Sequence, residues 1–397
     1  MAVKPSAPAP SKRQFRVRLA ALVLLGVVIR VAYTIWVAPW PPRSLTDEYY
    51  YGLLPGLIAH GRGFIDPLQS VLLGRKVVSA QHAPLYPLVL TALHKLGGTG
   101  QEAQRLMGSA FGAGTIVTLA LLGRRLAGER VGIVAASIAA VYPMLITADG
   151  ALMSESLYGF LIGLTLLTAF RFRDAPGFRS AALLGVAAGL AALTRGEGFL
   201  LLLLLLAPTF RSPRRVRAAV TAFLTMLIVL TPWTVRNAIV FHQFVLVSTD
   251  EGITIAGANC RLTYYGNQIG SWHPGPPCTK SYSGNDAAVS SRQLSDGLHY
   301  AEHHLGRLPI VVLAREARAW SLFHTGLTDD GRSPGAERLG ILSYYLLVLL
   351  AWYGFIILRR RRLPTWIVTA PILLVAITVA VTFGVTRFGS RPSCPSL

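Results

Sequence analysis

Two adjacent carboxylates, Asp47 and Glu48, are the residues of this sequence whose type and position best suit chemistry. They follow an apolar stretch at residues 19–38, and three consecutive tyrosines stand behind them. A carboxylate at a lipid boundary is partly desolvated, which makes it a stronger base and suits the removal of a proton from an alcohol. The competing interpretation is a helix cap, in which Thr46 and Asp47 open an interfacial helix.

A second group of acids lies at Asp149 and Glu155, between two later apolar stretches. Acids at the ends of different membrane spans can converge on one face, as a site for a cation or for sugar hydroxyls requires. The alternative is again capping, with Asp149 and Ser154 at the start of a helix.

Arg195 is the third candidate, because the flanking Gly196 and Gly198 let a ligand approach the backbone closely and a guanidinium can hold a phosphate. An ion pair between Arg195 and Glu197 that closes a helical hairpin explains the same residues equally well. Arg30 lies inside the first apolar stretch, where it either reaches the interface or finds a partner, and it receives no role.

The composition indicates that these residues belong to an integral membrane protein. Apolar residues make up 52% of the chain and charged residues 14%, and the net charge is +20. Uninterrupted apolar runs such as residues 199–207 exclude an ordinary soluble domain, a disordered chain and the alternating strands of a β-barrel. The basic residues form short clusters between apolar runs, which favours a membrane surface over nucleic acid.

Nine apolar stretches predict nine membrane crossings. They lie at about 19–38, 105–122, 131–148, 152–170, 180–194, 197–210, 216–235, 338–358 and 364–386. With the amino end in the cytoplasm, the inner segments hold 19 basic and two acidic residues, which agrees with the positive-inside rule. The apolar segment 84–96 is short and contains two prolines, and as a crossing it would invert every later loop, so we place it at the outer boundary.

Two predicted outer regions, 39–104 and 236–337, are too long to be simple connections, so we expect the chemistry there. The predicted organisation is a basic tail (1–18), an N-terminal membrane module (19–235), the outer region 236–337 and a C-terminal membrane region (338–397). Cys260 and Cys278 lie 18 residues apart on the oxidising side. A disulfide is favoured over two free thiols, and a zinc site lacks partners.

Taken in order, these motifs resemble the GT-C glycosyltransferases, and glycosyltransferase family 39 in particular, which includes protein O-mannosyltransferases and the lipid A aminoarabinose transferase. The resemblance covers roughly residues 15–390. The motifs are Asp47-Glu48, Gln81-His82-Ala83-Pro84-Leu85-Tyr86-Pro87, Gly123-Arg124-Arg125-Leu126, Asp149 with Leu152-Met153-Ser154-Glu155, and Leu193-Thr194-Arg195. The resemblance implies an all-α polytopic membrane protein with a GT-C-like helical bundle and outer juxtamembrane helices.

The resemblance also implies roles for single residues. Asp47 matches the family's acid in the first outer loop, the base or acceptor-positioning carboxylate, and Glu48 matches the acid beside it. Asp149 matches the second outer-loop acid, which binds a cation or the acceptor, with Glu155 nearby. His82 falls where the family has a polar residue before a proline pair, although that pair is reduced here. A divalent metal ion, with Asp47 and Asp149 as candidate ligands, is the cofactor that this implies.

The carboxyl end departs from the family pattern. Relatives continue with a further apolar span after a segment like Val385-Thr386-Arg387-Phe388, whereas this chain continues with Gly-Ser-Arg-Pro-Ser-Cys-Pro-Ser-Leu and stops. The sequence therefore predicts a truncated C-terminal region.

The expected function is the transfer of a sugar from a polyprenyl-monophosphate carrier to a glycan, lipid or protein acceptor on the outer face of a bacterial plasma membrane. Direct displacement with inversion is the expected course, and Arg195 is expected to bind substrate. No nucleic-acid partner is expected. The alternative is a transporter or flippase for lipid-linked sugars, but the inverted repeats typical of transporters are not evident.

Overall fold

The computed structural model describes residues 12–38, 47–211, 213–323 and 334–384. Within these ranges the regular structure is helical, and β pairing is confined to an isolated antiparallel bridge between Ile65 and Val78. The helices are α1 (Lys12–Ala32), α2 (Asp47–Ala59), α3 (Pro67–Leu73), α4 (Leu85–Lys95), α5 (Gln101–Ala127), α6 (Glu129–Val141), α7 (Pro143–Gly150), α8 (Glu155–Asp174), α9 (Phe178–Thr194), α10 (Gly198–Leu206), α11 (Pro213–Phe241), α12 (Asp250–Ala258), α13 (Arg261–Tyr264), α14 (Asp286–Glu302), α15 (Leu308–Ala319), α16 (Pro334–Arg360) and α17 (Trp366–Val381). A π-helix (Tyr33–Val37) extends α1, and 3₁₀ turns lie at Ala207–Arg211 and Gly266–Gln268. The predicted all-α fold class is confirmed.

Four helical segments are long and apolar enough to cross a membrane: Lys12–Val37, Gln101–Ala127, Arg215–Phe241 and Leu339–Arg360. Helices α6 and α7 pass the same test together, although they meet at a 54° bend. The chain is therefore a multi-pass membrane protein. The count of nine crossings is not confirmed, because α9, α10 and α17 are apolar but shorter than 18 residues. The residues of the predicted truncation, 385–397, lie outside the described part of the chain.

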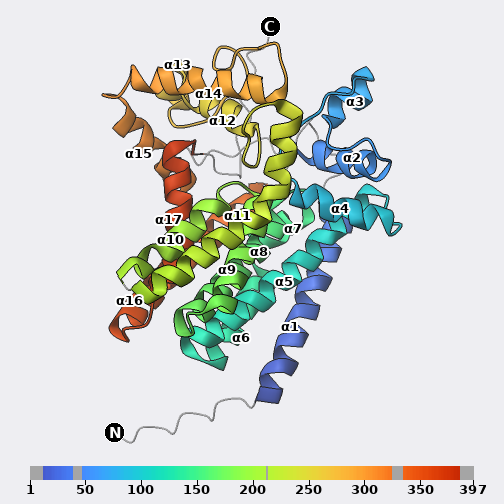
Figure 1. Ribbon diagram of the computed structural model, residues 1–397. Helices are drawn as coiled ribbons and strands as arrows, with labels where there is room; N and C mark the ends of the chain where they lie inside the picture. Colours follow the sequence, from blue (N-terminus) through green and yellow to red (C-terminus); the bar gives the residue numbers. More distant parts are fainter. Residues whose placement is uncertain (1–11, 39–46, 212, 324–333, 385–397) are drawn as a thin grey trace, which may run out of the picture.

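The long helices form a bundle, and the short helices of both predicted outer regions lie at one end of it (Figure 1). Helices α2, α3 and α4 are found there together with α12 to α15, whereas the start of α1 lies at the opposite end. Helix α4 has 11 residues, about 16 Å, and is too short to cross the hydrocarbon. We call the end with α2 to α4 the outer end and the end with the start of α1 the inner end.

Short polar caps fix the helices at the outer end. Asp66 accepts hydrogen bonds from the backbone N–H groups of Leu68 (2.9 Å) and Gln69 (3.0 Å), and Pro67 takes the first position of α3. Gly74 ends that helix with φ +65°, a left-handed conformation that glycine adopts without strain. These signals hold α3 to its 7 residues and turn the chain back toward α4.

Small residues bring the bundle helices into close contact. A Cβ atom at Gly185 of α9 would overlap the carbonyl oxygen of Ala222 of α11, so the two helices touch through their backbones. The largest apolar cluster lies around these helices and includes buried residues of α8, α10 and α17. Close packing of small residues is how helices associate in lipid, where burial of apolar surface gives little drive.

A tyrosine-rich cluster anchors the short outer helices on the bundle. Tyr50 and Tyr51 of α2 pack with Tyr86 of α4 against Leu157 and Leu161 of α8. The Tyr51 and Tyr86 rings meet edge to face at 5.0 Å. Because these side chains are nearly fully buried, α2 and α4 are fixed relative to the long helices, and so are the polar residues that they carry.

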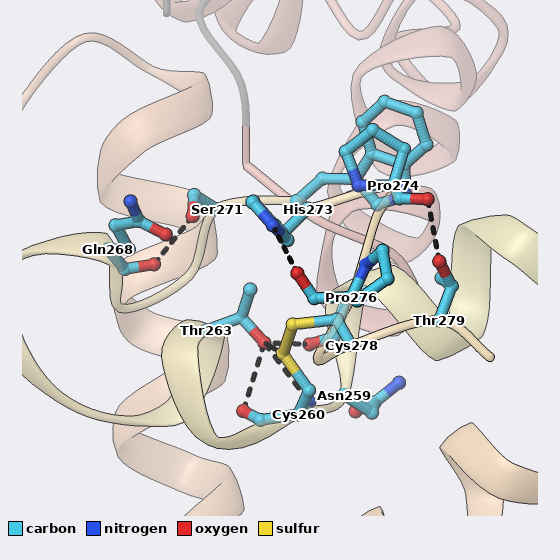
Figure 2. Close-up of a disulfide and its surroundings, with 12 residues drawn as sticks. Asn259, Cys260, Thr263, Gln268, Ser271, His273, Pro274, Pro276, Cys278 and Thr279 are labelled. Atoms are coloured by element: carbon cyan, nitrogen blue, oxygen red, sulfur yellow. Dashed lines mark hydrogen bonds between the residues drawn. A yellow bond between two sulfur atoms is a disulfide. The ribbon is translucent and has the colours of Figure 1, made fainter. Parts of the chain in front are cut away.

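The region 236–337 is tied together by a disulfide and a buried arginine. The disulfide joins Cys260 and Cys278, and the Thr263 hydroxyl donates hydrogen bonds to the backbone beside it (Figure 2). Arg315 of α15 is 1% exposed and donates to the carbonyl oxygens of Ala258 (2.7 Å) and Ala380 (2.8 Å). These acceptors lie in the last turns of α12 and α17, where helix dipoles favour a cation. Arg315 thus joins the outer region to the last described helix.

Removing the disulfide with Cys260→Ala and Cys278→Ala is expected to destabilise the protein by about 3 kcal/mol, because the bond closes a loop of 18 residues in the unfolded chain. Thermal unfolding in detergent measures this, with reductant added to the wild type as the matched control. A double variant that unfolds at the wild-type temperature would contradict it.

Candidate active site

The first predicted acids lie at the start of α2. Asp47 is the first residue of the helix and Glu48 the second, where carboxylates interact favourably with the helix dipole. The side chain of Asp47 is 52% exposed. Burial is the largest cause of the raised pKa of Tyr86, and the charges of Tyr51 and then Glu48 add to it. Asp47 therefore opens a helix and also presents its carboxylate at the surface, and its role as a base stays a prediction.

His82 faces Asp47 from the segment before α4. Its Nε2 lies 3.5 Å from Asp47 Oδ1, an ion-pair distance, and its side chain is 10% exposed. The imidazole packs edge to face on Tyr50 at 4.5 Å and lies 5.2 Å from the Tyr51 ring. The two tyrosines hold the imidazole ring in place. The ion pair joins the start of α2 to the segment before α4, and both belong to the region 39–104.

Burial alone would lower the pKa of His82, but the nearby carboxylate of Asp47 outweighs this effect. Asp250 adds to the effect, and the pKa of His82 is raised from its ordinary value of 6.5. The folded protein therefore stabilises the imidazolium relative to a free histidine.

Asp250 also belongs to this site, although the sequence motifs did not predict it. It is the first residue of α12, and the N–H of the preceding Thr249 donates to the carbonyl oxygen of Ala80 at 2.9 Å. This backbone hydrogen bond places the start of α12 beside the segment that carries His82. Burial raises the pKa of Asp250, and the charge of His82 partly offsets the rise.

A signal for Asp250 is present in the sequence. The tripeptide Thr-Asp-Glu occurs at 46–48 and again at 249–251, and the aspartate of each copy is the first residue of a helix at the outer end. The second copy lies inside a long Gly- and Ser-rich region, where it looks like an ordinary helix start.

Arg195 lies in the turn between α9 and α10 and is bound by two carboxylates. Its Nη1 is 2.9 Å from Glu155 Oε1, and its Nε is 2.7 Å from Glu197 Oε1. Its guanidinium also lies 6.0 Å from the centre of the Tyr158 ring. The structure thus contains the Arg195–Glu197 pair that was the alternative to phosphate binding, and it also brings Arg195 and Glu155 together. We call one group of residues the outer polar site: Asp47, His82, Asp250, and Arg195 with its partners Glu155 and Glu197.

Asp149 belongs to a different cluster. It is 2% exposed, and its Oδ2 accepts from Arg30 Nε at 2.7 Å. Arg30 also donates to the carbonyl oxygens of Ala139 and Ala140, both at 3.0 Å. These carbonyls stand just before the bend between α6 and α7, where the missing N–H of Pro143 breaks the helical hydrogen bonds. Arg30 therefore supplies hydrogen-bond donors to carbonyl oxygens at the bend between α6 and α7. Asp149 neutralises the buried charge of Arg30.

The chain is similar to a known protein family in sequence and to solved structures in fold. Residues 81–235 match the model of a family described as dolichyl-phosphate-mannose-protein mannosyltransferase, and this segment holds His82, Asp149, Glu155 and Arg195. No curated protein sequence matches the chain. Among solved structures, the Archaeoglobus fulgidus oligosaccharyltransferase in its apo form superposes with a TM-score of 0.52 over 95% of this chain at 16% identity.

The chain has a GT-C-like fold. ArnT from Cupriavidus metallidurans bound to undecaprenyl phosphate superposes with a TM-score of 0.49 over 94% of the chain at 16% identity. The Saccharomyces cerevisiae Pmt1–Pmt2 complex bound to the sugar donor gives 0.46 over 63% at 17% identity. This GT-C-like chain spans 48% of the oligosaccharyltransferase, 77% of ArnT and 37% of the Pmt chain. The predicted resemblance to GT-C glycosyltransferases is confirmed.

In this GT-C-like chain the thermal stability is expected to fall as the pH rises through the raised pKa of His82. The folded protein favours the imidazolium, so its contribution is complete below the ordinary value of 6.5 and is lost above the folded-state pKa. His82→Gln should lack this part of the decline when unfolding temperatures are compared across the pH range. His60→Gln, which alters an exposed histidine of the same region, should keep it. An equal decline in His82→Gln and wild type would refute the assignment.

Proposed function

We propose that this chain is a membrane glycosyltransferase that moves a sugar from a polyprenyl-monophosphate carrier to an acceptor hydroxyl on the extracytoplasmic face. The observation that supports it best is the Asp47–His82 ion pair beside Asp250, at the end of the bundle where the short helices lie. A half-exposed carboxylate held by a buried imidazole can reach a substrate while keeping a defined position.

In the proposed reaction Asp47 accepts the proton of the acceptor hydroxyl as the oxygen attacks the anomeric carbon. The bond between that carbon and the phosphate oxygen breaks, and polyprenyl phosphate leaves with the electron pair. Attack on the face opposite the leaving group inverts the anomeric centre, and no covalent enzyme intermediate is needed. His82 orients the Asp47 carboxylate, and the charge of Asp250 favours the imidazolium of His82.

The outer polar site contains more acids than cations. Four carboxylates, those of Asp47, Asp250, Glu155 and Glu197, surround the charges of His82 and Arg195. Carboxylates suit sugar hydroxyls as hydrogen-bond acceptors and repel a phosphate. We therefore assign this site to the sugar and the acceptor, and Arg195 to holding Glu155 and Glu197 in place.

The predicted divalent metal ion has no clear ligand set in the described ranges. No group of three His, Cys, Asp or Glu side chains is close enough there to share an ion. Asp149, one of the two candidate ligands, is already bound by Arg30. The base chemistry proposed for Asp47 does not depend on a metal ion.

The proposed orientation places the amino end in the cytoplasm of a bacterium and the outer polar site outside the plasma membrane. Three charge clusters support it. Arg124 and Arg125 end α5, Arg171 and Arg173 end α8, and Arg359 and Arg360 end α16. Basic residues on one side of the bundle mark the cytoplasmic face.

Membranes that contain the protein should release label from one member of a panel of radiolabelled polyprenyl-monophosphate sugars and pass it to an added hydroxyl acceptor. Membranes from cells without the protein are the control. Movement of the intact labelled lipid between leaflets, with no label leaving it, would establish the alternative of a flippase and overturn the proposal.

A further inference from the structure

A cavity lies at the inner end of the bundle, away from the outer polar site. Its volume is about 160 Å³, and it is lined by residues of α8, α9, α10, α11 and α17 together with the turns next to them. An apolar cavity of about 150 Å³ is large enough to hold benzene. This cavity therefore has room for a short length of hydrocarbon chain.

The interior of the cavity is apolar. Ala169, Leu184, Leu205 and Ile367 are all less than 9% exposed and form its wall. Trp366 completes the lining, and its indole N–H donates to the carbonyl oxygen of Leu204 at 2.6 Å. Tryptophan is typical of the membrane–water interface, where its ring is in lipid and its N–H finds a polar partner.

Two arginines stand at the surface of this apolar lining. Arg173 and Arg215 both line the cavity, and both are exposed, unlike the wall residues. Asp174 faces Arg173 Nε at 3.2 Å and also pairs with Arg125, so its one negative charge is shared. Arg215 makes no ion pair with a described residue. Positive charge is thus left over where the apolar cavity opens.

The location of the cavity matches the headgroup level of the inner leaflet. Its lining comes from the last turn of α8, the turn Ala207–Arg211, and the starts of α11 and α17. These parts lie at the inner end of the bundle in Figure 1. Cytoplasmic leaflets are rich in anionic lipids, and basic pockets between membrane helices at this level bind their headgroups.

We propose that this cavity is a binding site for an anionic phospholipid, with the phosphate held between Arg173 and Arg215 and part of an acyl chain inside the apolar wall. The occupant must be amphipathic because the lining is apolar inside and cationic at the surface. A soluble anion would leave the cavity unfilled, and a neutral lipid would leave the two arginines uncompensated. The site is independent of the proposed glycosyl transfer.

Native mass spectrometry of the purified protein can test the site with phosphatidylglycerol and phosphatidylcholine of identical acyl chains. The wild type should bind phosphatidylglycerol more tightly. The double variant Arg173→Gln, Arg215→Gln should weaken this binding about 25-fold, since each basic residue near a lipid surface contributes about fivefold. Arg179→Gln with Arg359→Gln, which removes two exposed charges outside the lining, should leave it unchanged.

The apolar wall is tested separately. Ala169→Leu places a larger side chain in the cavity and should reduce the binding of phosphatidylglycerol, while inorganic phosphate should not displace the lipid from the wild type. Equal losses in both double arginine variants would show a diffuse charge effect and overturn the site. Equal binding of the two lipids, or displacement by phosphate alone, would also overturn it.

Discussion

Replacing Asp47 with asparagine is expected to lower kcat/KM for sugar transfer about 10²- to 10⁴-fold, the usual contribution of a general base. The amide has the size of the carboxylate, so the side chain still fits at the start of α2. It cannot accept the proton of the acceptor hydroxyl, however, and it loses the charge that faces His82 across 3.5 Å. The measurement is the rate at which label passes from the lipid donor to the acceptor.

Two further variants separate this chemistry from the role of Asp47 in the helix. Glu102→Gln removes an exposed acid from the first turn of α5, so it tests the loss of a helix-dipole interaction, about 0.3–1 kcal/mol, without touching the site. Asp47→Glu keeps the carboxylate and should recover part of the rate. If Asp47→Asn transferred sugar within threefold of the wild-type rate, Asp47 would be only a helix start.

Local patterns in the sequence predicted the helical membrane fold. Long apolar runs gave the spans, because a backbone in lipid must satisfy its own hydrogen bonds and a helix does so. The two prolines and the small length of residues 84–96 predicted a segment too short to cross the membrane, and α4 has 11 residues. The number of crossings was harder to predict, because packing allows helices such as α9 and α17 to be shorter than a full span.

The partners of the site residues could not be read from spacing. Arg30 and Asp149 are 119 residues apart, and the sequence around each residue does not indicate that the other is its partner. Asp250 joins the outer polar site through a backbone hydrogen bond from Thr249 to Ala80, which no pattern of side chains signals. The repeated Thr-Asp-Glu tripeptide shows that a local sequence reports a helix start, whereas tertiary contacts decide which starts meet.

Gly112 shows how a single residue makes such a distant contact possible. A Cβ atom at this position of α5 would overlap both Asp149 Oδ2 and Arg30 Nε. The sequence contains many glycines, and only the three-dimensional contact distinguishes the one that leaves room for a buried ion pair.

Breaking that ion pair is expected to have the largest effect on stability. Asp149→Asn should lower the free energy of unfolding by about 3–5 kcal/mol, because it leaves the fully buried guanidinium of Arg30 without a counter-charge. Denaturant titration in detergent micelles measures the change. Asp174→Asn is the matched control. The Asp174 side chain is 44% exposed, so its ion pairs with Arg125 and Arg173 should contribute less than about 1 kcal/mol.

The double variant Arg30→Met, Asp149→Leu should be more stable than Arg30→Met alone, because no buried carboxylate is left without its cation. It should still be less stable than the wild type, since the carbonyl oxygens of Ala139 and Ala140 lose their donors, at about 1–3 kcal/mol for each unsatisfied group. If Asp149 instead binds substrate, as its sequence position predicts, Asp149→Asn would abolish sugar transfer and leave unfolding unchanged. Measuring both quantities on the same preparation therefore decides whether Asp149 acts on the substrate or holds the bend between α6 and α7.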